Sequence, residues 1–478
     1  MYEYQGMYVA GEWTAVSGPV IEVVSPADNR VIGQVSEARA DDVDVAVHAA
    51  RAALESGAWA NSTAEDRAAV LDAIAAGIKA RSGEFADLSS AEVGSPRAWA
   101  SFGQVSTAVG VYAASAKALR TYEFESTRPS VIGGEVLVRR VPVGVVGAIV
   151  PWNAPLFTAA LKLAPALAAG CTVVLKPSPD APLALALFSE VLEQAGLPAG
   201  VVNIVSGGVE TGRALVSNPG VDKISFTGST AAGARIGEAC SRDVRRVTLE
   251  LGGKSAAIVL DDVEVDKKLI DGLVTGVMAN NGQICVAQTR ILVPRGRYDE
   301  VVEPLAEAVS AMRVGDPADR ATEVGPVINA AARDRIEAAV SGAVAEGARV
   351  VAGGTRPEGL DAGSYVAPTV LADVDNQMAV ARDELFGPVA VVVPYDDEDD
   401  AVRIANDSEY GLAGAVWSAD TSRATRVAGR LRVGSVSVNS PAPVDFGSPF
   451  GGFKKSGFGR EGGPEGIDAY VEAQSIIL

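Results

Sequence analysis

The chain has 478 residues, of which 48% are hydrophobic and 21% charged, as is typical of a soluble protein of two or three domains. Its formal net charge of −19 argues against nucleic acid as a partner, because no basic excess is available to displace counterions. The longest apolar stretch, residues 141–161, contains Pro142, Pro151 and Pro155 and is a poor membrane span, so no membrane partner is expected.

The cysteine content and the first residues predict a cytoplasmic setting. Three cysteines are too few for a disulfide framework, and no basic residue of the kind found in a secretory signal precedes Arg30. The sequon at Asn61 then has no secretory context. We interpret Ser62 and Glu65 as the capping box of a helix over residues 66–78.

Two segments predict β-structure outside a regular α/β pattern. Residues 122–141 are expected to form a polar hairpin, and residues 469–478 a strand with no helix after it. Exposed strand edges are usually paired, and here they could pair with another subunit or within the chain.

Short β-branched runs alternate with Ala/Leu-rich helical stretches from Gly144 onward. This alternation predicts parallel strands joined by right-handed helical crossovers. The expected strands of a first block are 145–150, 171–176, 201–205 and 223–228. Those of a second block lie near 289–293, 366–371, 389–393, 412–417 and 434–438. We expect two α/β domains with a cleft between them.

Several motifs fail their structural test. The sequence GFGREG at 457–462 follows no strand, and GGKS at 252–255 has Thr248 where a phosphate loop needs glycine. A single histidine, His48, excludes a histidine cluster, so no metal site is expected. The acids at 396–400 are interpreted as the first turn of a helix rather than a cation site.

A better phosphate candidate is FTGSTAAG at 226–233, which places Gly228 and Ser229 at a strand-to-helix turn. The alternative is an ordinary Ser229 cap. Lys176 ends another strand of the same block, and parallel sheets bind ligands at this edge, which favours a dinucleotide.

Cys285 and Glu250 are the candidate reactive groups. Cys285 lies between Ile284 and Val286, where it could be a nucleophile or a small buried hydrophobe. Glu250 lies between two leucines, and apolar surroundings would raise its pKa toward that of a useful base; the alternative is a carboxylate at a strand end.

Seven motifs occur in one order along the chain: PWNAP (151–155), LKPSP (175–179), FTGST (226–230), LELGGKS (249–255), NNGQIC (280–285), ELFGPV (384–389) and PFGGFKKSGFGRE (449–461). Each motif is weak alone, but their joint order resembles the NAD(P)-dependent aldehyde dehydrogenase family over nearly the whole chain. The resemblance implies an α/β fold of the aldehyde-dehydrogenase type, with two parallel-sheet domains and a small β oligomerisation arm.

The same resemblance implies domain boundaries and assembly. The dinucleotide-binding domain would comprise residues 1–121 and 142–250, and the catalytic domain residues 251–452. Residues 122–141 and 453–478 would form the arm of a homodimer or homotetramer.

The resemblance also implies a chemistry. Cys285 would attack a small-molecule aldehyde, while the Asn153 side chain and the Cys285 backbone N–H hold the oxyanion. After hydride transfer to NAD, Glu250 would activate water to release the carboxylic acid. Lys162 and Glu461 match positions implicated in relaying protons.

For the cofactor, the resemblance places Lys176 at the adenosine ribose, Trp152 and Ser229 along the pyrophosphate, and Glu384 at the nicotinamide ribose with Phe386 nearby. The remaining implied cofactor contacts are Gly207, Phe226, Gly228 and Leu251. Pro179 stands where many NAD-preferring members have a glutamate that bonds the ribose, so NAD is expected while NADP stays open.

A second departure concerns the substrate tunnel, where Ala154, Thr158 and Leu161 replace bulkier residues of many members. A roomy apolar tunnel around Phe157, Ile284 and Val286, entered past residues 440–448, would suit medium-chain or aromatic aldehydes. The alternatives are a CoA-acylating enzyme, a cofactor-free thiol hydrolase and a non-catalytic relative.

Overall fold

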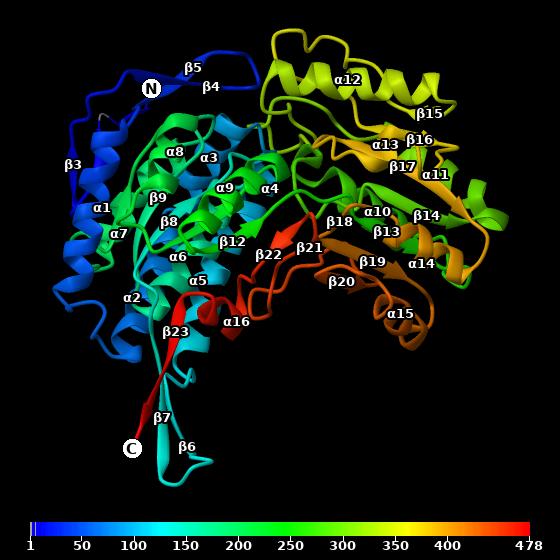
Figure 1. Cartoon of the computed structure of the whole chain (residues 1–478). Helices are drawn as coiled ribbons and strands as arrows, with labels where there is room; N and C mark the ends of the chain where they lie inside the picture. Colours follow the sequence, from blue (N-terminus) through cyan, green and yellow to red (C-terminus); the bar gives the residue numbers. More distant parts are fainter. Residues whose placement is uncertain (1, 5) are drawn as a thin grey trace.

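The computed structural model describes residues 2–4 and 6–478, and an eight-stranded sheet organises the first half of the chain (Figure 1). Its strand order is β22-β12-β11-β8-β9-β10-β2-β3. The parallel strands are β8 (Val145–Ile149), β9 (Thr172–Lys176), β10 (Val202–Ile204), β11 (Lys223–Thr227) and β12 (Arg246–Glu250). The antiparallel strands at its ends are β2 (Met7–Val9), β3 (Glu12–Thr14) and β22 (Gly457–Phe458). The four strands expected in the first block are thereby confirmed.

Helices connect these parallel strands and cover both faces of the sheet. The crossover helices are α6 (Pro155–Ala169), α7 (Leu183–Gln194), α8 (Val209–Ser217) and α9 (Thr230–Arg242). The helices between β3 and β8 are α1 (Ala40–Glu55), α2 (Ala64–Ala80), α3 (Ser82–Val93), α4 (Arg97–Trp99) and α5 (Thr107–Leu119). In α6 every residue except Phe157 is buried, because the helix is apolar apart from Thr158 and Lys162 and lies between the sheet and helices α2 and α5.

The predicted cap of α2 is wrong by one residue. Thr63 is the N-cap: its hydroxyl accepts from the Asp66 backbone N–H, and the Asp66 carboxylate accepts from the Thr63 N–H, each at 3.1 Å. Ser62 instead donates its hydroxyl to the Trp59 carbonyl in the preceding turn, so it is not free to cap.

A seven-stranded sheet organises the second half, in the order β15-β16-β17-β14-β13-β19-β20. Its strands are β13 (Ala256–Val259), β14 (Arg290–Pro294), β15 (Arg349–Ala352), β16 (Thr369–Ala372), β17 (Val389–Tyr395), β19 (Ala413–Trp417) and β20 (Ser435–Val438). All are parallel except the edge strand β15. The five expected strands are confirmed, and β13 and the edge strand β15 are two further strands that were not predicted.

Two apolar clusters hold helices against the two faces of this sheet. On one face lie α10 (Lys267–Met278) and α11 (Tyr298–Ser310). On the other lie α12 (Ala330–Ala345), α13 (Ala379–Arg382), α14 (Glu398–Asn406) and α15 (Thr421–Ala428). Asp397 caps α14 and the next three acids occupy its first turn, which confirms the interpretation of that acidic run.

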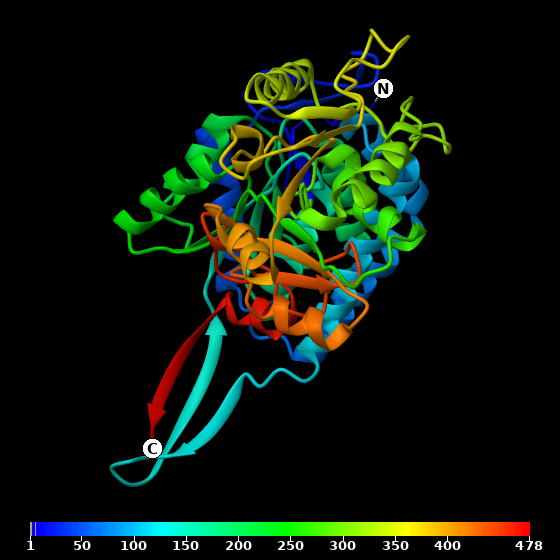
Figure 2. The same cartoon turned by 90° about the vertical axis from the view of Figure 1, so that its right-hand side faces the viewer.

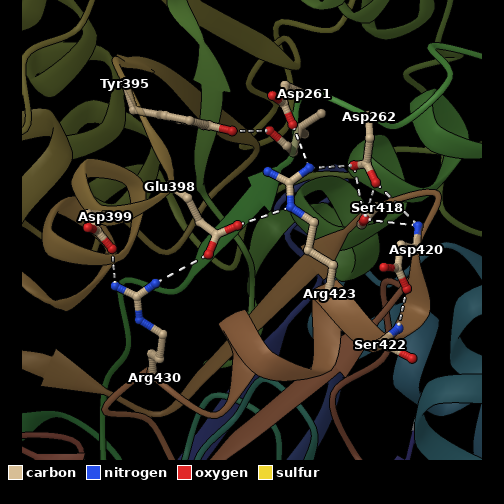
Figure 3. Close-up of polar contacts among 11 residues, drawn as sticks. Asp261, Asp262, Tyr395, Glu398, Asp399, Ser418, Asp420, Ser422, Arg423 and Arg430 are labelled. Atoms are coloured by element: carbon tan, nitrogen blue, oxygen red, sulfur yellow. Dashed lines mark hydrogen bonds and ion pairs between the residues drawn. The ribbon is translucent and has the colours of Figure 1, made fainter.

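Arginines on and just after α15 join this region to α14 and the end of β13 (Figure 3). Arg423 lies 2.6 Å from Asp261 and 3.0 Å from Glu398, and Arg430 reaches Glu398 and Asp399. Asp262 completes the group by accepting from the Ser418 hydroxyl. We call these six charged residues, Asp261, Asp262, Glu398, Asp399, Arg423 and Arg430, the distal ion-pair network.

A three-stranded arm projects from the body (Figure 2). It consists of β6 (Glu125–Pro129), β7 (Glu135–Pro142) and β23 (Val471–Ile477). The predicted hairpin and tail strand are both confirmed, and the tail pairs within the chain, in antiparallel register with β7. The remaining elements are β1 (Tyr2–Tyr4), β4 (Val20–Val24), β5 (Val31–Ser36), β18 (Tyr410–Gly411), β21 (Phe453–Lys454) and α16 (Gly463–Asp468).

Across the part of the chain that the structure describes, no helix combines the length and apolar character needed to cross a bilayer. The proposed boundaries of the domains stay a prediction.

Candidate active site

Cys285 lies on a buried loop whose backbone is held in an unusual conformation. Asn280 and Asn281, just after α10, have φ of 52° and 59°, and Gly282 has φ of 70°. Asparagine tolerates this left-handed region better than other residues with a Cβ, but a run of such residues must be stabilised by its surroundings. Asn281 supplies this support, since its amide donates to the Gly94 and Pro326 carbonyls at 2.8 and 2.9 Å.

Asn153 meets this loop from the end of β8. Its side-chain Nδ2 donates to the carbonyl of Gln283, two residues before Cys285, at 2.9 Å. The amide group has two N–H donors, so one remains for another acceptor. The loop is fixed in turn because Gln283 Oε1 accepts from the Ile328 N–H at 2.9 Å. The structure therefore brings Asn153 and the Cys285 loop together.

The segment after β12 passes close to both Cys285 and Glu384. A Cβ at Gly253 would lie 2.4 Å from the Cys285 carbonyl oxygen, and one at Gly252 would lie 2.3 Å from a Glu384 carboxylate oxygen. Only glycine fits against the Cys285 carbonyl, and a side chain at Gly252 would displace the Glu384 carboxylate. The Gly253 N–H donates to Glu384 Oε1 at 2.9 Å, which ties the two sides of the site together.

The environment of Cys285 disfavours its charged form. The half-buried side chain packs beside the core of the first half. Burial, followed by the negative charges of Glu384 and Glu250, raises the pKa of its thiol to about 12. The chain's own residues therefore keep Cys285 protonated near neutral pH.

Glu250 ends β12 as a buried carboxyl group. Burial, and then the charge of Glu461, raise its pKa well above the usual value, against opposing effects of Lys162 and Arg460. Neither of its oxygens has a hydrogen-bond partner among residues 2–4 and 6–478. An unpaired carboxyl group with a raised pKa beside a cysteine is the arrangement expected of a general base.

A buried ion pair lies next to Glu250. Lys162, in the middle of α6, contacts Glu461 at 2.6 Å, and both side chains are almost fully buried. Backbone hydrogen bonds with Phe450 hold Glu461 in place. Its second carboxylate oxygen has no partner within the described residues, so Glu461 keeps an acceptor free near Glu250.

The strand-to-helix turn between β11 and α9 gathers four of the predicted cofactor residues. Ser229 caps α9, with its hydroxyl accepting from the Ala232 N–H at 3.3 Å. The Gly228 N–H donates to the Glu250 carbonyl, and a Cβ there would lie 2.5 Å from the Phe226 ring. Leu251 packs against α9 at Gly233. The cap interpretation is confirmed, and a helix N-terminus at this sheet edge also suits an anionic group.

Lys176 and Gly207 lie at the same edge. Lys176 ends β9 with a buried side chain whose Nζ donates to the Pro177 carbonyl at 2.7 Å, and burial lowers its pKa to about 8. Gly207 lies between β10 and α8, where a Cβ would collide with Thr211. Pro179, three residues after Lys176, is half-buried.

Trp152 and Phe386 meet across the two halves of the chain. Their rings contact edge to face, with centroids 5.5 Å apart and planes at 88°. Phe386 has a φ of 57°, a strained backbone position for an aromatic residue. Strain of this kind often marks a functional position.

Apolar residues of the predicted tunnel pack against the same core as Cys285. Phe157 and Phe446 stand edge to face with centroids 6.1 Å apart, and Val286 and Val444 pack against the same core as Cys285. The predicted tunnel residues Ala154, Thr158 and Leu161 are buried, whereas Ile284 is half-buried.

Sequence reasoning missed two residues of this region. Gln104 donates to the Asn153 carbonyl at 2.8 Å, and Gly110 leaves the space that the Phe446 ring occupies, since a Cβ there would lie 2.6 Å from it. Both contacts join residues far apart in sequence, and neither has a motif that could have shown it.

Residues 13–476 match the model of the Aldehyde dehydrogenase family. The chain is 47% identical to geranial dehydrogenase of Castellaniella defragrans over 477 residues, covering 100% of this chain and 99% of that protein. A Mycobacterium tuberculosis aldehyde dehydrogenase complexed with NAD+ has a TM-score of 0.98 and 46% identity, covering 100% of this chain and 98% of that one. An aldehyde dehydrogenase C mutant from Pseudomonas syringae, complexed with NAD+ and octanal, has a TM-score of 0.94 and 42% identity, covering 99% and 96%.

The chain therefore belongs to the aldehyde dehydrogenase family, and its fold is the aldehyde dehydrogenase fold.

Proposed function

We propose that this enzyme oxidises apolar aldehydes of medium length, or aromatic ones, to carboxylic acids with NAD+. The observation that carries the proposal is the meeting of Cys285, Asn153 and the unpaired Glu250 beside an apolar approach. Relatives named for geranial and crystallised with octanal support an apolar substrate.

The first step is acyl-enzyme formation on Cys285. The thiol passes its proton to Glu250, and the sulfur attacks the aldehyde carbon to form a thiohemiacetal. The Cys285 backbone N–H and the N–H of Asn153 that Gln283 leaves free would stabilise the oxyanion. When bound, NAD+ supplies the acceptor for the hydride whose loss leaves a thioester on Cys285.

The second step releases the acid. Glu250 first passes on the proton that it took from Cys285. It then takes a proton from water as the water oxygen attacks the thioester carbon; the C–S bond breaks and Cys285 leaves as a thiolate. Glu461 and Lys162 would carry the proton onward, since Glu461 keeps an oxygen free beside Glu250.

The residues at the sheet edge fit a dinucleotide. The capped N-terminus of α9, with Ser229 and Gly228, suits the pyrophosphate, and buried Lys176 suits a ribose hydroxyl. Glu384 would hold the second ribose. The remaining contacts would come from Trp152, Gly207, Phe226, Leu251 and Phe386. Pro179 presents no carboxylate against a 2′-phosphate, so NADP+ is a second candidate.

A homo-oligomer built through the arm forms part of the proposal. Val131, Ile132, Ile477 and Leu478 expose apolar side chains on the arm, with Val131 fully exposed. Exposed apolar residues beside open strand edges favour pairing with another subunit. Light scattering tests this, and a strict monomer would contradict it. The three unpaired cysteines support a reducing compartment such as the cytoplasm.

The absorbance of reduced cofactor tests the activity, with octanal, geranial, benzaldehyde and succinic semialdehyde offered with NAD+ or NADP+. We expect the apolar aldehydes to give higher kcat/KM than the semialdehyde. Acyl-CoA formation on adding CoA would favour the acylating alternative, and ester hydrolysis as the sole activity would favour the thiol hydrolase. If no aldehyde yields reduced cofactor, the proposal fails.

A further inference from the structure

The backbone carbonyl of Asn153 accepts two side-chain amides that come from distant parts of the chain. Gln104 Nε2 donates to it at 2.8 Å, and Asn280 Nδ2 donates at 3.0 Å. Asn280 belongs to the loop that carries Cys285, whereas Gln104 comes from the helical region before β8. All three residues are buried. The carbonyl is therefore held by two donors, while the side chain of the same residue bonds to the Cys285 loop.

Gln104 reaches this position from a π-helix, Ala100–Ser106, inserted between α4 and α5. A π-turn is rare, and such turns are frequent at functional sites because they shift side chains away from the positions of a regular helix. Gln104 is fully buried, and its Oε1 has no hydrogen-bond partner in the described part of the chain. Leaving a buried amide oxygen unpaired is unfavourable, so folding stability alone gives a poor reason for glutamine here.

We propose that Gln104 is a positioning residue for the reaction, acting through the Asn153 carbonyl to aim the Asn153 side-chain amide at the oxyanion. The inference rests on the proposed function of Asn153. An oxyanion donor works by being held in place before the charge develops, so small errors in its direction slow the reaction. Gln104 and Asn280 together hold the backbone that sets this direction.

The first test is Gln104→Met, which keeps the length of the side chain and removes the donor. We expect the pre-steady-state burst of reduced cofactor to slow by about tenfold, less than the loss from deleting an oxyanion donor outright. The KM for NAD+ should stay unchanged. An unchanged burst rate would overturn the proposal.

A double-mutant cycle tests whether Gln104 acts through Asn153. In an Asn153→Ala background there is no side-chain amide left to aim, so Gln104→Met should cause no further slowing. An undiminished tenfold effect in that background would show that Gln104 acts by another route and would overturn the proposal.

A matched control separates positioning from general loss of stability. Asn203 is also a buried amide that donates to a backbone carbonyl, that of Gly200 at 2.8 Å, and it lies on β10 away from Asn153. Asn203→Leu should lower the Tm without slowing the burst. Gln104→Glu gives a rescue: its carboxyl group donates only when protonated, so its rate relative to Gln104→Met should rise as the pH falls.

A reaction that needs no cofactor tests the role of Gln104 independently of aldehyde oxidation. Acylation of Cys285 by an activated ester breaks the ester C–O bond and forms a C–S bond, and it needs oxyanion stabilisation without aldehyde or NAD+. Gln104→Met should slow this acylation too. If wild-type enzyme acylates Cys285 but oxidises no aldehyde, the proposed substrate class fails while Gln104 is still judged by the ester reaction. An unaltered acylation rate would overturn its positioning role.

Discussion

The active site and the distal ion-pair network both contain several carboxylates, but the environments of these carboxylates are opposite in the two regions. In the network each of Asp261, Glu398 and Asp399 faces an arginine at a partly exposed position (Figure 3). Hydrogen bonding to Asp261 is the largest influence raising the pKa of Arg423. In the active site, Glu250 is buried, has no hydrogen-bond partner among the described residues and has a raised pKa.

The difference separates stability from reactivity. Paired, solvated charges remain ionised and change little with their surroundings, so they can only support the fold. A buried group without a partner holds its charge at a cost, and that cost makes the group a stronger base for proton transfer. If this comparison is right, substitutions in the active site should lower the reaction rate, and substitutions in the distal ion-pair network should lower the stability of the fold.

The largest expected effect comes from Glu250→Gln. Because the variant can take a proton from neither the Cys285 thiol nor water, the burst of one reduced cofactor per active site should slow, and steady turnover should fall by roughly 10²–10⁴-fold. Rapid-mixing absorbance measures both phases. Cys285→Ala is the control and should remove the burst as well. Steady turnover at the wild-type rate would show that Glu250 is not the base.

The next prediction concerns the pH dependence of Cys285 in the cofactor-free enzyme. A pKa of about 12 means that the thiol is protonated at lower pH, and the thiolate fraction then grows about tenfold per pH unit. Alkylation by iodoacetamide, followed by mass spectrometry at Cys285, should therefore accelerate steadily from neutral pH without a plateau. Burial raises the pKa of Glu384 to about 7, so Glu384→Gln removes a negative charge at alkaline pH and should speed alkylation there. A plateau at neutral pH would mean that the site does not suppress the thiolate.

A smaller effect is expected at Gly110. A side chain there would push the Phe446 ring from its place beside Phe157 toward the substrate approach. Gly110→Val should lower kcat/KM for octanal by about tenfold and leave that for acetaldehyde nearly unchanged. Adding Phe446→Leu should restore part of the octanal activity. Equal losses for both aldehydes would show that Gly110 does not shape the tunnel.

The smallest effect belongs to the distal ion-pair network. Arg423→Met should lower the free energy of unfolding by about 1 kcal/mol, measured by urea denaturation, and leave kcat unchanged. The exposed pair of Arg242 with Glu238 offers a comparison, since Arg242→Met should have almost no effect. A fall in kcat for Arg423→Met would undo the separation between the two regions.

The sequence predicted the strands well because their apolar runs are local, and it located Cys285 and Glu250 through motifs in a fixed order. It could not predict that Asn280 and Asn281 would adopt left-handed backbone conformations, which depend on partners such as Gly94 and Pro326. Gln104 was missed for a related reason. A π-turn has no periodic signature, and its contact with Asn153 exists only after two segments have folded together.

The buried helix α6 has a consequence for altering this enzyme. Asn153 precedes its first turn, Phe157 lies in that turn and Lys162 lies near its middle. From Pro155 to Lys162 the helix rises by roughly 10 Å, so the proposed oxyanion donor just before it, one wall of the proposed aldehyde tunnel and the proposed proton relay are held by one rigid helix. Any shift of α6 that admitted a longer aldehyde would also misalign Asn153 and Lys162. Substrate range should therefore be changed by substitutions at Gly110 and in the loop at 440–448, because these can leave α6 in place.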